Sequence, residues 1–436
     1  MLNFFKYSLL TVIALLIGCS DEPLNSPYDK SDNDNIFYSS FQERPKHLDP
    51  ARSYSSNEYA FIAQIYEPLF QYHYLKKPYE LIPLTAKEMP SIQYLDNNFN
   101  ETKSKKNAYY TKYILKIKKG ILYQNHPAFH KDNNNFTYHN LSRTQLSGIN
   151  TLKDFQYNST RELISDDYIY QIKRLADYKN HSPISGVMQE YILGFTEYKN
   201  KINAFKKNNQ EYKNNFILEN EISGVKKIDN YSFSITLKKS YPQFKYWLAM
   251  PFFSPMAWEV DLFYQQNGLQ KKNITLNWFP VGTGPFKLTE NNPNLRMVLE
   301  RNKNFRGEVY PSASDKITNR KLESFNKAKV IPYIDKAIYS LEKEQIPRWN
   351  KFLQGYYDNS GIMSDNYDQA VSLSKSGDIT LTEELKSQGI NLTTAAAAST
   401  YYIGFNMLDD VVGGNTKQSR LLRQAISIAI DYDEYI

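Results

Sequence analysis

Four ionisable side chains between residues 126 and 139 could hold a metal ion. His126 and His130 stand four residues apart, and Asp132 and His139 follow them. Histidines at this spacing share one face of a helix and are common zinc ligands. However, Pro127 lies inside the spacing and three asparagines follow shortly afterwards, a combination that disfavours a helix. We therefore expect a solvated loop here and no metal site.

The motifs of common enzyme classes are missing from this sequence. It contains no nucleophile elbow, no metalloprotease helix and no glycine-rich loop of the kind that holds a phosphate. Gly282-Thr283-Gly284 lacks the third glycine and the following helix of a dinucleotide site. An enzyme would have to assemble its site from residues that lie far apart in sequence. We therefore predict a binding protein without a cofactor rather than an enzyme.

The single cysteine, Cys19, follows a segment typical of exported proteins. Lys6 supplies positive charge, and Leu9–Ile17 is an apolar core too short to span a bilayer comfortably. Leu16-Ile17-Gly18-Cys19 resembles a bacterial lipobox, in which the cysteine is lipidated and becomes the new N-terminus. The alternative is an ordinary signal peptide with an incidental cysteine. We predict a lipoprotein signal peptide over residues 1–18, lipidation of Cys19, and no thiol left for a disulfide or a metal.

Residues 19–35 are rich in Asp, Asn, Ser and Pro and predict a flexible tether between membrane and folded protein. The expected location is the periplasm or cell envelope, with the lipid at Cys19 as the anchor. Ser20 rather than aspartate follows the cysteine, which in many Gram-negative bacteria favours the outer membrane. Because that sorting rule varies, the choice between inner and outer membrane stays open.

Charge and composition exclude one class of partner and suggest another. The formal net charge is +7, but the basic residues are scattered and no basic helix gathers them, so we expect no nucleic-acid partner. The chain has 36 Tyr and 24 Phe, well above ordinary usage. Large cores explain such a content, and so does a groove lined by rings whose hydroxyls bind a polar ligand.

Val281–Gly307 predicts a hairpin that begins at a sharp turn. The glycines of Gly282-Thr283-Gly284 can adopt positive φ, and Pro285 fixes φ directly after them. Phe286–Leu288 and Leu295–Arg301 show strand patterns on either side of a segment rich in turn formers. Other segments with clear patterns are strands over Ile36–Phe41, Tyr113–Lys118, Ile222–Lys239 and Thr400–Met407, and helices after Asn57, over Asp166–Asp177, over Trp349–Gly355 and over Arg420–Ile430.

The sequence motifs in these segments, and their order along the chain, resemble those of family 5 solute-binding proteins, the oligopeptide and dipeptide receptors of ABC importers. The resemblance rests on Gly-Thr-Gly-Pro-aromatic at 282–286, on Tyr66-Glu67-Pro68-Leu69, and on the acidic-to-basic helix 166–177. It also rests on Arg420–Asp431, which matches a second-lobe hallmark. The chain departs from the pattern at Phe286, Phe305 and Arg306, where tyrosine, tyrosine and tryptophan are commoner.

The resemblance implies an α/β, two-lobed fold like the type II periplasmic binding proteins. Residues 36–335 would form the first lobe with an inserted subdomain at about 62–165, and residues 336–436 a partial second lobe. The resemblance covers only the front portion of the family pattern. The sequence is therefore expected to be either a fragment or the product of a truncated gene.

The implied function is capture of oligopeptides in a cleft between the lobes, and delivery to the permease subunits of an ABC importer. Residues that the resemblance places at this cleft are Arg52, Ser53, Tyr54, Ser55, Ser56 and Asn57 on the first lobe, and Tyr401, Tyr402 and Asn406 on the second. A monomer is expected. The alternatives are a receptor of the same family for a nickel chelate or a saccharide, and a truncated lipoprotein that binds nothing.

Overall fold

The computed structural model describes residues 35–76, 78–103, 105, 108–208, 215–311, 329–373, 378–394, 399–400 and 402–432. These residues form two compact units, unit 1 up to Asp365 and unit 2 from Asn366. The lobe boundary predicted from the sequence, between Asp335 and Lys336, stays a prediction. The signal peptide, Cys19 and the tether up to residue 34 lie outside the described residues, as does Tyr401.

One four-stranded sheet of unit 1 joins the two ends of its sequence. Its strand order is β1-β14-β11-β10, with bounds β1 Ile36–Phe41, β14 Lys336–Leu341, β11 Arg296–Arg301 and β10 Phe286–Asn292. β1 and β14 are parallel, with Ile36 opposite Lys336, whereas the other pairs are antiparallel. The predicted hairpin is confirmed, although its first strand is longer than expected and contains a bulge between Leu288 and Glu290.

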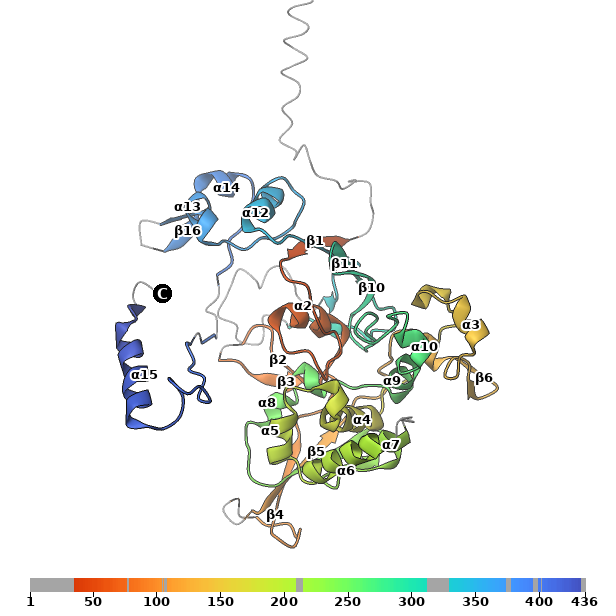
Figure 1. Ribbon diagram of the computed structural model, residues 1–436. Coiled ribbons are helices and arrows are strands. Elements are labelled where there is room, and N and C mark those ends of the chain that lie inside the picture. The colour runs from red at the N-terminus through yellow and green to blue at the C-terminus, as the bar shows by residue number, and fades with distance from the viewer. Residues whose placement is uncertain are drawn as a thin grey trace, which may run out of the picture. The chain divides into compact units, whose positions relative to one another are not determined.

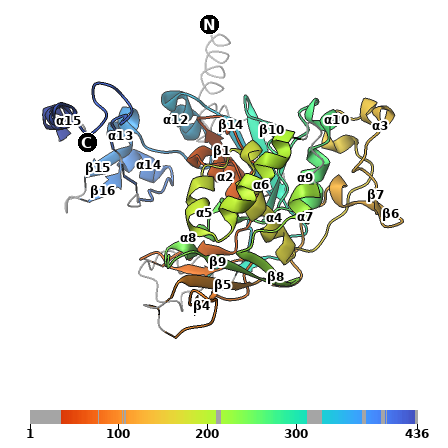
Figure 2. The same ribbon diagram turned by 60° about the horizontal axis from the view of Figure 1, so that its bottom comes forward.

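A second four-stranded sheet is antiparallel throughout, in the order β4-β5-β9-β8. Its strands are β4 Ser91–Leu95, β5 Tyr110–Lys116, β9 Ser232–Leu237 and β8 Val225–Asp229. Side chains of β5 alternate between buried and half-buried, as expected for a strand with one covered face. The two sheets lie at opposite ends of unit 1, with helices between them (Figure 1; Figure 2).

Helix α4, Ser165–Ala176, is the central helix of unit 1. Its start and end agree with the sequence prediction, but eleven of its twelve residues are buried rather than one face alone. It packs against β8, β9, three neighbouring α-helices and two 3₁₀ turns. The other helices of unit 1 are α2 Ser56–Ile65, α3 Arg143–Ser147, α5 Ser185–Tyr191, α6 Phe195–Asn208, α7 Asn215–Glu219, α8 Phe244–Trp247, α9 Trp258–Tyr264, α10 Asn267–Gln270 and α12 Gln345–Leu353.

Short elements complete unit 1. Its two-stranded ladders are β2 Phe70–Tyr72 with β3 Leu81–Pro83, β6 Lys131–Asp132 with β7 Asn135–Phe136, and β12 Glu308–Val309 with β13 Val330–Ile331. Single 3₁₀ turns are η2 Pro127–Phe129, η3 Leu152–Asp154, η4 Tyr178–Asn180 and η5 Pro251–Phe253. The predicted end of the helix before Gly355 is confirmed, since this glycine has φ +81° directly after α12.

Unit 2 is small and mostly exposed. Its elements are η7 Ser364–Asn366, which spans the division, α13 Tyr367–Ala370, β15 Val371–Leu373, β16 Ile379–Leu381, α14 Glu383–Ser387 and α15 Lys417–Ala429. Helix α15 confirms the prediction over Arg420–Ile430. The strand predicted over Thr400–Met407 is wrong for the residues described, because 402–406 have no strand structure. A strand requires a neighbour for its backbone hydrogen bonds, and no described residue pairs with this segment.

The hydrophobic core lies in unit 1. Its contiguous cluster of buried side chains extends from Phe41 to Ala337 along the sequence. In the described part of unit 2, the buried apolar side chains are Ala370, Leu381 and Leu385. No helix in the described parts of the chain has the length and apolar character needed to cross a membrane.

Candidate functional site

One buried carboxylate holds the loop before α2, which contains the predicted residues Arg52 to Ser55, whereas Ser56 and Asn57 are the first two residues of α2. Glu58 accepts hydrogen bonds from the backbone N–H groups of Lys46, His47, Tyr54 and Ser55 at 2.7–3.3 Å. Burial alone would raise the pKa of Glu58, but these hydrogen bonds outweigh it and the pKa is lowered. The carboxylate therefore stays charged and fixes the shape of the loop.

An ion pair fixes the same loop to the centre of unit 1. Arg174 of α4 donates to both oxygens of Asp49 at 3.0 and 2.6 Å, and also lies 3.4 Å from Asp261 of α9. All three side chains are buried. A bidentate guanidinium–carboxylate pair is geometrically specific, so the loop has little freedom to rotate on the helix.

Only part of the predicted first-lobe segment reaches the surface. Tyr54 is 77% exposed, and Ser55 and Ser56 are exposed, whereas Ser53 is buried. Asn57 is half-buried, and its amide donates to the carbonyl oxygens of Glu43 and Arg44. Arg52 is also half-buried. Tyr54, Ser55 and Ser56 are thus the members of this segment best placed to touch a ligand.

Helix α2 continues this exposed surface. Phe61, Ile62 and Ile65 are buried, while Tyr59, Ala60 and Ala63 are exposed on the opposite side. Positions three and four apart share one face of a helix. The exposed strip therefore runs from Ser56 along one side of α2, and it leads to a cavity at the C-terminal end of this helix.

The Gly-Thr-Gly motif at residues 282–284 allows its own backbone to pass very close to the last turn of α2. A Cβ on Gly282 would lie 2.0 Å from the carbonyl oxygen of Ile65, and a Cβ on Gly284 would lie 2.7 Å from the same oxygen. The N–H of Gly284 donates to that oxygen at 2.8 Å. These glycines could adopt positive φ, but neither has it. Glycine is required here for close approach of two backbones.

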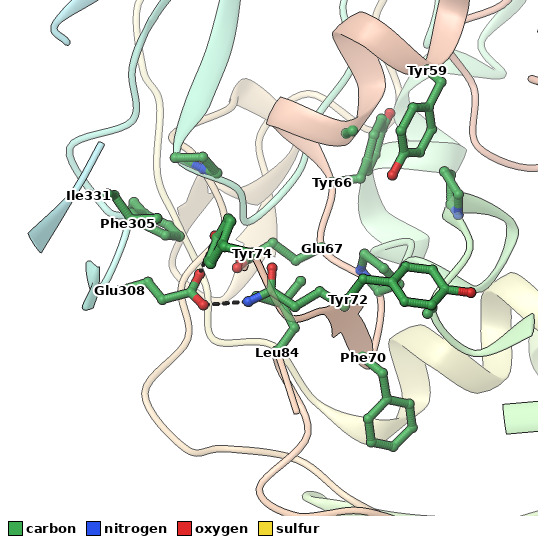
Figure 3. Close-up of a pocket in the computed structure, with 16 residues that line it drawn as sticks. Tyr59, Tyr66, Glu67, Phe70, Tyr72, Tyr74, Leu84, Phe305, Glu308 and Ile331 are labelled. Atoms are coloured by element: carbon green, nitrogen blue, oxygen red, sulfur yellow. Dashed lines mark hydrogen bonds between the residues drawn. The ribbon is translucent and has the colours of Figure 1, made fainter. Parts of the chain in front are cut away.

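The cavity itself has a volume of about 250 Å³ and lies wholly in unit 1. We call it the tyrosine hollow. It is lined by Tyr59, Ala63, Tyr66, Glu67, Pro68, Phe70, Gln71, Tyr72, Tyr74, Leu84, Ala249, Pro251, Pro285, Phe305, Glu308 and Ile331. Figure 3 shows Tyr59 and Tyr66 on one side of it, Phe305, Glu308 and Ile331 on the other, and Tyr74 between them.

The first carboxylate of the hollow, Glu67, is fully engaged by its neighbours. It is buried, lies 2.8 Å from the guanidinium of Arg306 and accepts a hydrogen bond from Thr283 Oγ1 at 2.8 Å. Burial raises the pKa of Glu67, and the charge of Arg306 opposes that shift. Arg306, a departure from the family pattern in the sequence, thus supplies the charge that a buried glutamate needs.

The second carboxylate, Glu308, has neutral partners. Gln71 Nε2 donates to Glu308 Oε1, and the Tyr74 hydroxyl donates to Glu308 Oε2 at 3.4 Å (Figure 3). Burial and then the charge of Glu308 raise the pKa of Tyr74, so its hydroxyl stays protonated at neutral pH. These residues could not be predicted from the sequence, because residue 308 is far from residues 71 and 74 and no motif links them.

The structure does not test the cleft role predicted for Tyr401, Tyr402 and Asn406. Tyr402 is 86% exposed and Asn406 is exposed, with its side-chain oxygen accepting the N–H of Leu408 at 3.1 Å. Since Tyr401 lies outside the described residues, the role of the three residues at a cleft stays a prediction.

The predicted solvated loop is wrong at residues 126–129, which are buried, whereas residues 131–135 are exposed. His126 is 1% exposed, its Nε2 lies 2.8 Å from the Tyr264 hydroxyl, and its Nδ1 accepts the N–H of Ala128 at 3.1 Å. Burial, followed by the charge of His139, lowers its pKa to about 3. Pro127 starts a buried 3₁₀ turn rather than a surface loop. The described residues contain no group of three or more His, Cys, Asp or Glu side chains arranged to hold a metal ion.

Comparison with known proteins assigns the family. Residues 151–436 match the family described as bacterial extracellular solute-binding proteins, family 5. The dipeptide-binding protein of Escherichia coli (strain K12) is 24% identical over 311 residues, which are 70% of this chain and 44% of that protein.

Solved structures similar to this chain include two receptors with bound peptides. Listeria monocytogenes OppA bound to peptide matches with a TM-score of 0.48 and 12% identity, over 78% of this chain and 48% of that one. Helicobacter pylori DppA in complex with the peptide STSA matches with a TM-score of 0.45 and 17% identity, over 74% and 45% of the two chains. The chain thus spans about half the length of the relatives that it matches. With the match covering residues 151–436, the chain belongs to the bacterial extracellular solute-binding proteins of family 5.

Proposed function

We propose that the protein captures oligopeptides outside the cytoplasm, in a cleft between two lobes, and delivers them to the permease of an ABC importer. The observation that carries the proposal is the family match over residues 151–436. The matched relatives whose names state a ligand bind a dipeptide or a peptide. A solute-binding family implies binding without a change of covalent bonds.

The exposed surface of unit 1 suits a peptide. Tyr54 and Ser55 offer a ring and a hydroxyl group on a loop that Glu58 and Arg174 hold rigid, and Ser56 adds a second hydroxyl group at the start of α2. A rigid surface loses little conformational entropy on binding, and tyrosine contributes a large contact area with few rotatable bonds. Polar groups on such a wall can bind a peptide backbone, while waters accommodate varied side chains. In our proposal Tyr401, Tyr402 and Asn406 contribute from the second lobe.

Anchoring belongs to the same proposal. Lipidation of Cys19 and a tether up to residue 35 would keep a monomeric receptor near the importer in the membrane. Mass spectrometry of the protein from membranes, with and without a Cys19→Ser substitution, tests this part. A diacylglycerol adduct that is lost in the variant is the expected result, and an unmodified Cys19 in the mature protein would contradict it.

Isothermal titration calorimetry with defined peptide pools tests the proposed function. We expect binding of di- to hexapeptides, and no comparable binding of a saccharide or a nickel chelate. Tyr54→Ala should weaken peptide binding by roughly 1–2 kcal/mol, about five- to thirtyfold in Kd, as expected for an exposed aromatic contact. Tyr178→Ala, which also removes an exposed tyrosine, is the control. A sugar or chelate that binds while every peptide fails would overturn the substrate assignment.

A further inference from the structure

We propose that the tyrosine hollow binds the cationic side chain of a basic residue, arginine or lysine, in a bound peptide. This inference rests on the proposed function, because it assigns one side-chain pocket of the same receptor. The sixteen lining residues include six aromatic side chains and two glutamates, and none of them is lysine, arginine or histidine. The wall is thus aromatic and acidic.

Glu308 is the glutamate of the hollow that has no ion-pair partner among the described residues. The other glutamate of the hollow, Glu67, pairs with Arg306 at 2.8 Å. From the described residues, Glu308 receives the amide of Gln71 and the hydroxyl of Tyr74, both of which are neutral donors. Among the residues described, no basic group forms an ion pair with it. A half-buried carboxylate without a cation is stabilised when an ammonium or guanidinium group arrives.

The two basic residues behind the hollow are occupied elsewhere. Lys118 Nζ donates to the carbonyl oxygen of Leu84 at 2.7 Å. Arg306 Nη2 points to the same oxygen at 3.4 Å, and its Nη1 contacts Glu67. Burial, then the neighbouring charge of Arg306, lowers the pKa of Lys118, and the charges of Glu308 and Glu67 oppose that shift. A ligand cation would therefore meet no fixed cation on the wall of the hollow.

Aromatic rings line the open side of the hollow. Tyr59, Tyr72 and Tyr74 are 53%, 47% and 43% exposed, so each presents ring surface to an incoming group. Tyr74 also packs on Tyr310, with ring centroids 5.4 Å apart. Tyrosine faces attract organic cations, and arginine in particular stacks on them. The methylene groups of lysine or arginine would contact Pro251, Phe305 and Ile331, which also line the hollow.

The size of the hollow points to one side chain rather than to a whole ligand. Its volume of about 250 Å³ is below the range of roughly 300–1,000 Å³ that is usual for complete small-molecule sites. It opens beside the exposed strip of α2, where Ala60 and Ala63 leave room for a backbone to pass. An extended peptide on that strip could therefore place one side chain into the hollow.

The test uses blocked amino acids, because they carry the side chain without an amino-terminal charge. We expect N-acetyl-arginine amide to bind the full chain about tenfold more tightly than N-acetyl-citrulline amide, its neutral analogue of the same shape. N-acetyl-lysine amide should show the same advantage over N-acetyl-norleucine amide. NMR titration with labelled tyrosine measures both affinities. Equal affinity for the two members of each pair, or no binding of the blocked amino acids at tens of millimolar, would overturn the inference. Both results are obtained with the unsubstituted protein.

Two substitutions localise the effect. Glu308→Gln keeps the hydrogen-bonding shape but removes the charge, and it should abolish the preference for arginine over citrulline. Glu219→Gln makes the same change at an exposed glutamate on α7 and should leave the preference intact. Circular dichroism verifies that both variants are folded. A preference that survives in Glu308→Gln would place the cation elsewhere and refute the assignment.

Peptides separate this inference from the proposed function. Alanine pentapeptides with one central arginine or citrulline should differ in Kd about tenfold. If both peptides bind equally, the protein is a peptide receptor and the hollow is not a cation site. If the blocked arginine binds and no peptide does, the hollow is a cation site and the peptide-receptor proposal fails.

Discussion

Two buried glutamates in unit 1 have opposite pKa shifts, and the reason is the kind of partner each has. Glu58 accepts several backbone N–H groups, which favour its charged form strongly enough to lower its pKa despite burial. Glu67 has one guanidinium and one hydroxyl, and burial raises its pKa despite both. Glu58 therefore stabilises the shape of a loop at neutral pH. Glu67 instead depends on Arg306, because a buried glutamate needs a nearby positive charge to stay ionised.

His126 gives a pH-dependent contribution to stability. In the unfolded chain its pKa is near 6.5, whereas burial in the folded protein lowers it to about 3. Between these values the unfolded state binds a proton that the folded state does not, so the free energy of unfolding falls as the pH falls. The slope from this one group is at most about 1.4 kcal/mol per pH unit. This contribution is present above pH 6.5 and is lost progressively below it.

His126→Gln should remove that slope. Between pH 7.5 and 5.0, the unfolding free energy of the unsubstituted protein should fall by about 2 kcal/mol more than that of the variant. Urea unfolding at the two pH values measures the difference. His181→Gln, at an exposed position on the surface, should keep the original slope. Identical slopes for His126→Gln and the unsubstituted protein would show that His126 is not buried in its neutral form.

At the scale of elements, the junction between α2 and the Gly-Thr-Gly segment positions the hollow. Thr283 reaches Glu67, which directly follows the end of α2, and Gly284 donates to the last turn of this helix. Phe286 then begins β10, which packs against α2. One short segment therefore links the helix that carries Tyr59 to the sheet that organises unit 1.

Gly282→Ala should destabilise unit 1 by about 3 kcal/mol, because the new methyl group would lie 2.0 Å from a backbone oxygen that cannot move alone. Thermal unfolding followed by circular dichroism measures the loss. Gly186→Ala adds the same methyl group in α5, where no atom lies within 4 Å, and should be neutral or gain about 0.5 kcal/mol. Equal stability of the two variants would mean that the junction is looser than the structure shows.

Helices and strands that depend on the local pattern of apolar and polar residues were predictable from the sequence. The tyrosine hollow was not. Ile36–Phe41 and the helix over 166–177 follow from alternation, helical spacing and acidic residues at the helix start, and the mixed α/β class is confirmed. The strand at 400–407 was mispredicted, because a strand needs a partner that its own residues do not specify. The tyrosine hollow depends on Gln71 meeting Glu308, a contact between segments more than 200 residues apart.

At the scale of the molecule, burial is unequal between the two units. The core cluster extends to Ala337 and lies in unit 1, while Leu408 and Ile428 in unit 2 are 93% and 84% exposed. Regions with few buried apolar contacts open more easily than the core does. We therefore expect amides of unit 2 to exchange with solvent much faster than those of β5, β9 and α4.

The last prediction compares two shortened chains, one that ends at Asp365 and one that ends at Asp335. A chain that ends at Asp365 keeps β14 between β1 and β11, and it keeps the contacts of Asp358 and Asn359 with β1. It should unfold cooperatively, with a free energy of unfolding within about 1 kcal/mol of the value for unit 1 in the full chain.

A chain that ends at Asp335, the boundary predicted from sequence, loses β14 and leaves β1 and β11 without the strand between them. Unpaired backbone groups and lost core contacts, including that of Ala337, should then prevent cooperative folding. Differential scanning calorimetry distinguishes the two chains. Since the hollow lies in unit 1 alone, the Asp365 chain should also retain the preference for blocked arginine over citrulline. A cooperative transition in the Asp335 chain would instead mean that β14 belongs with the second lobe.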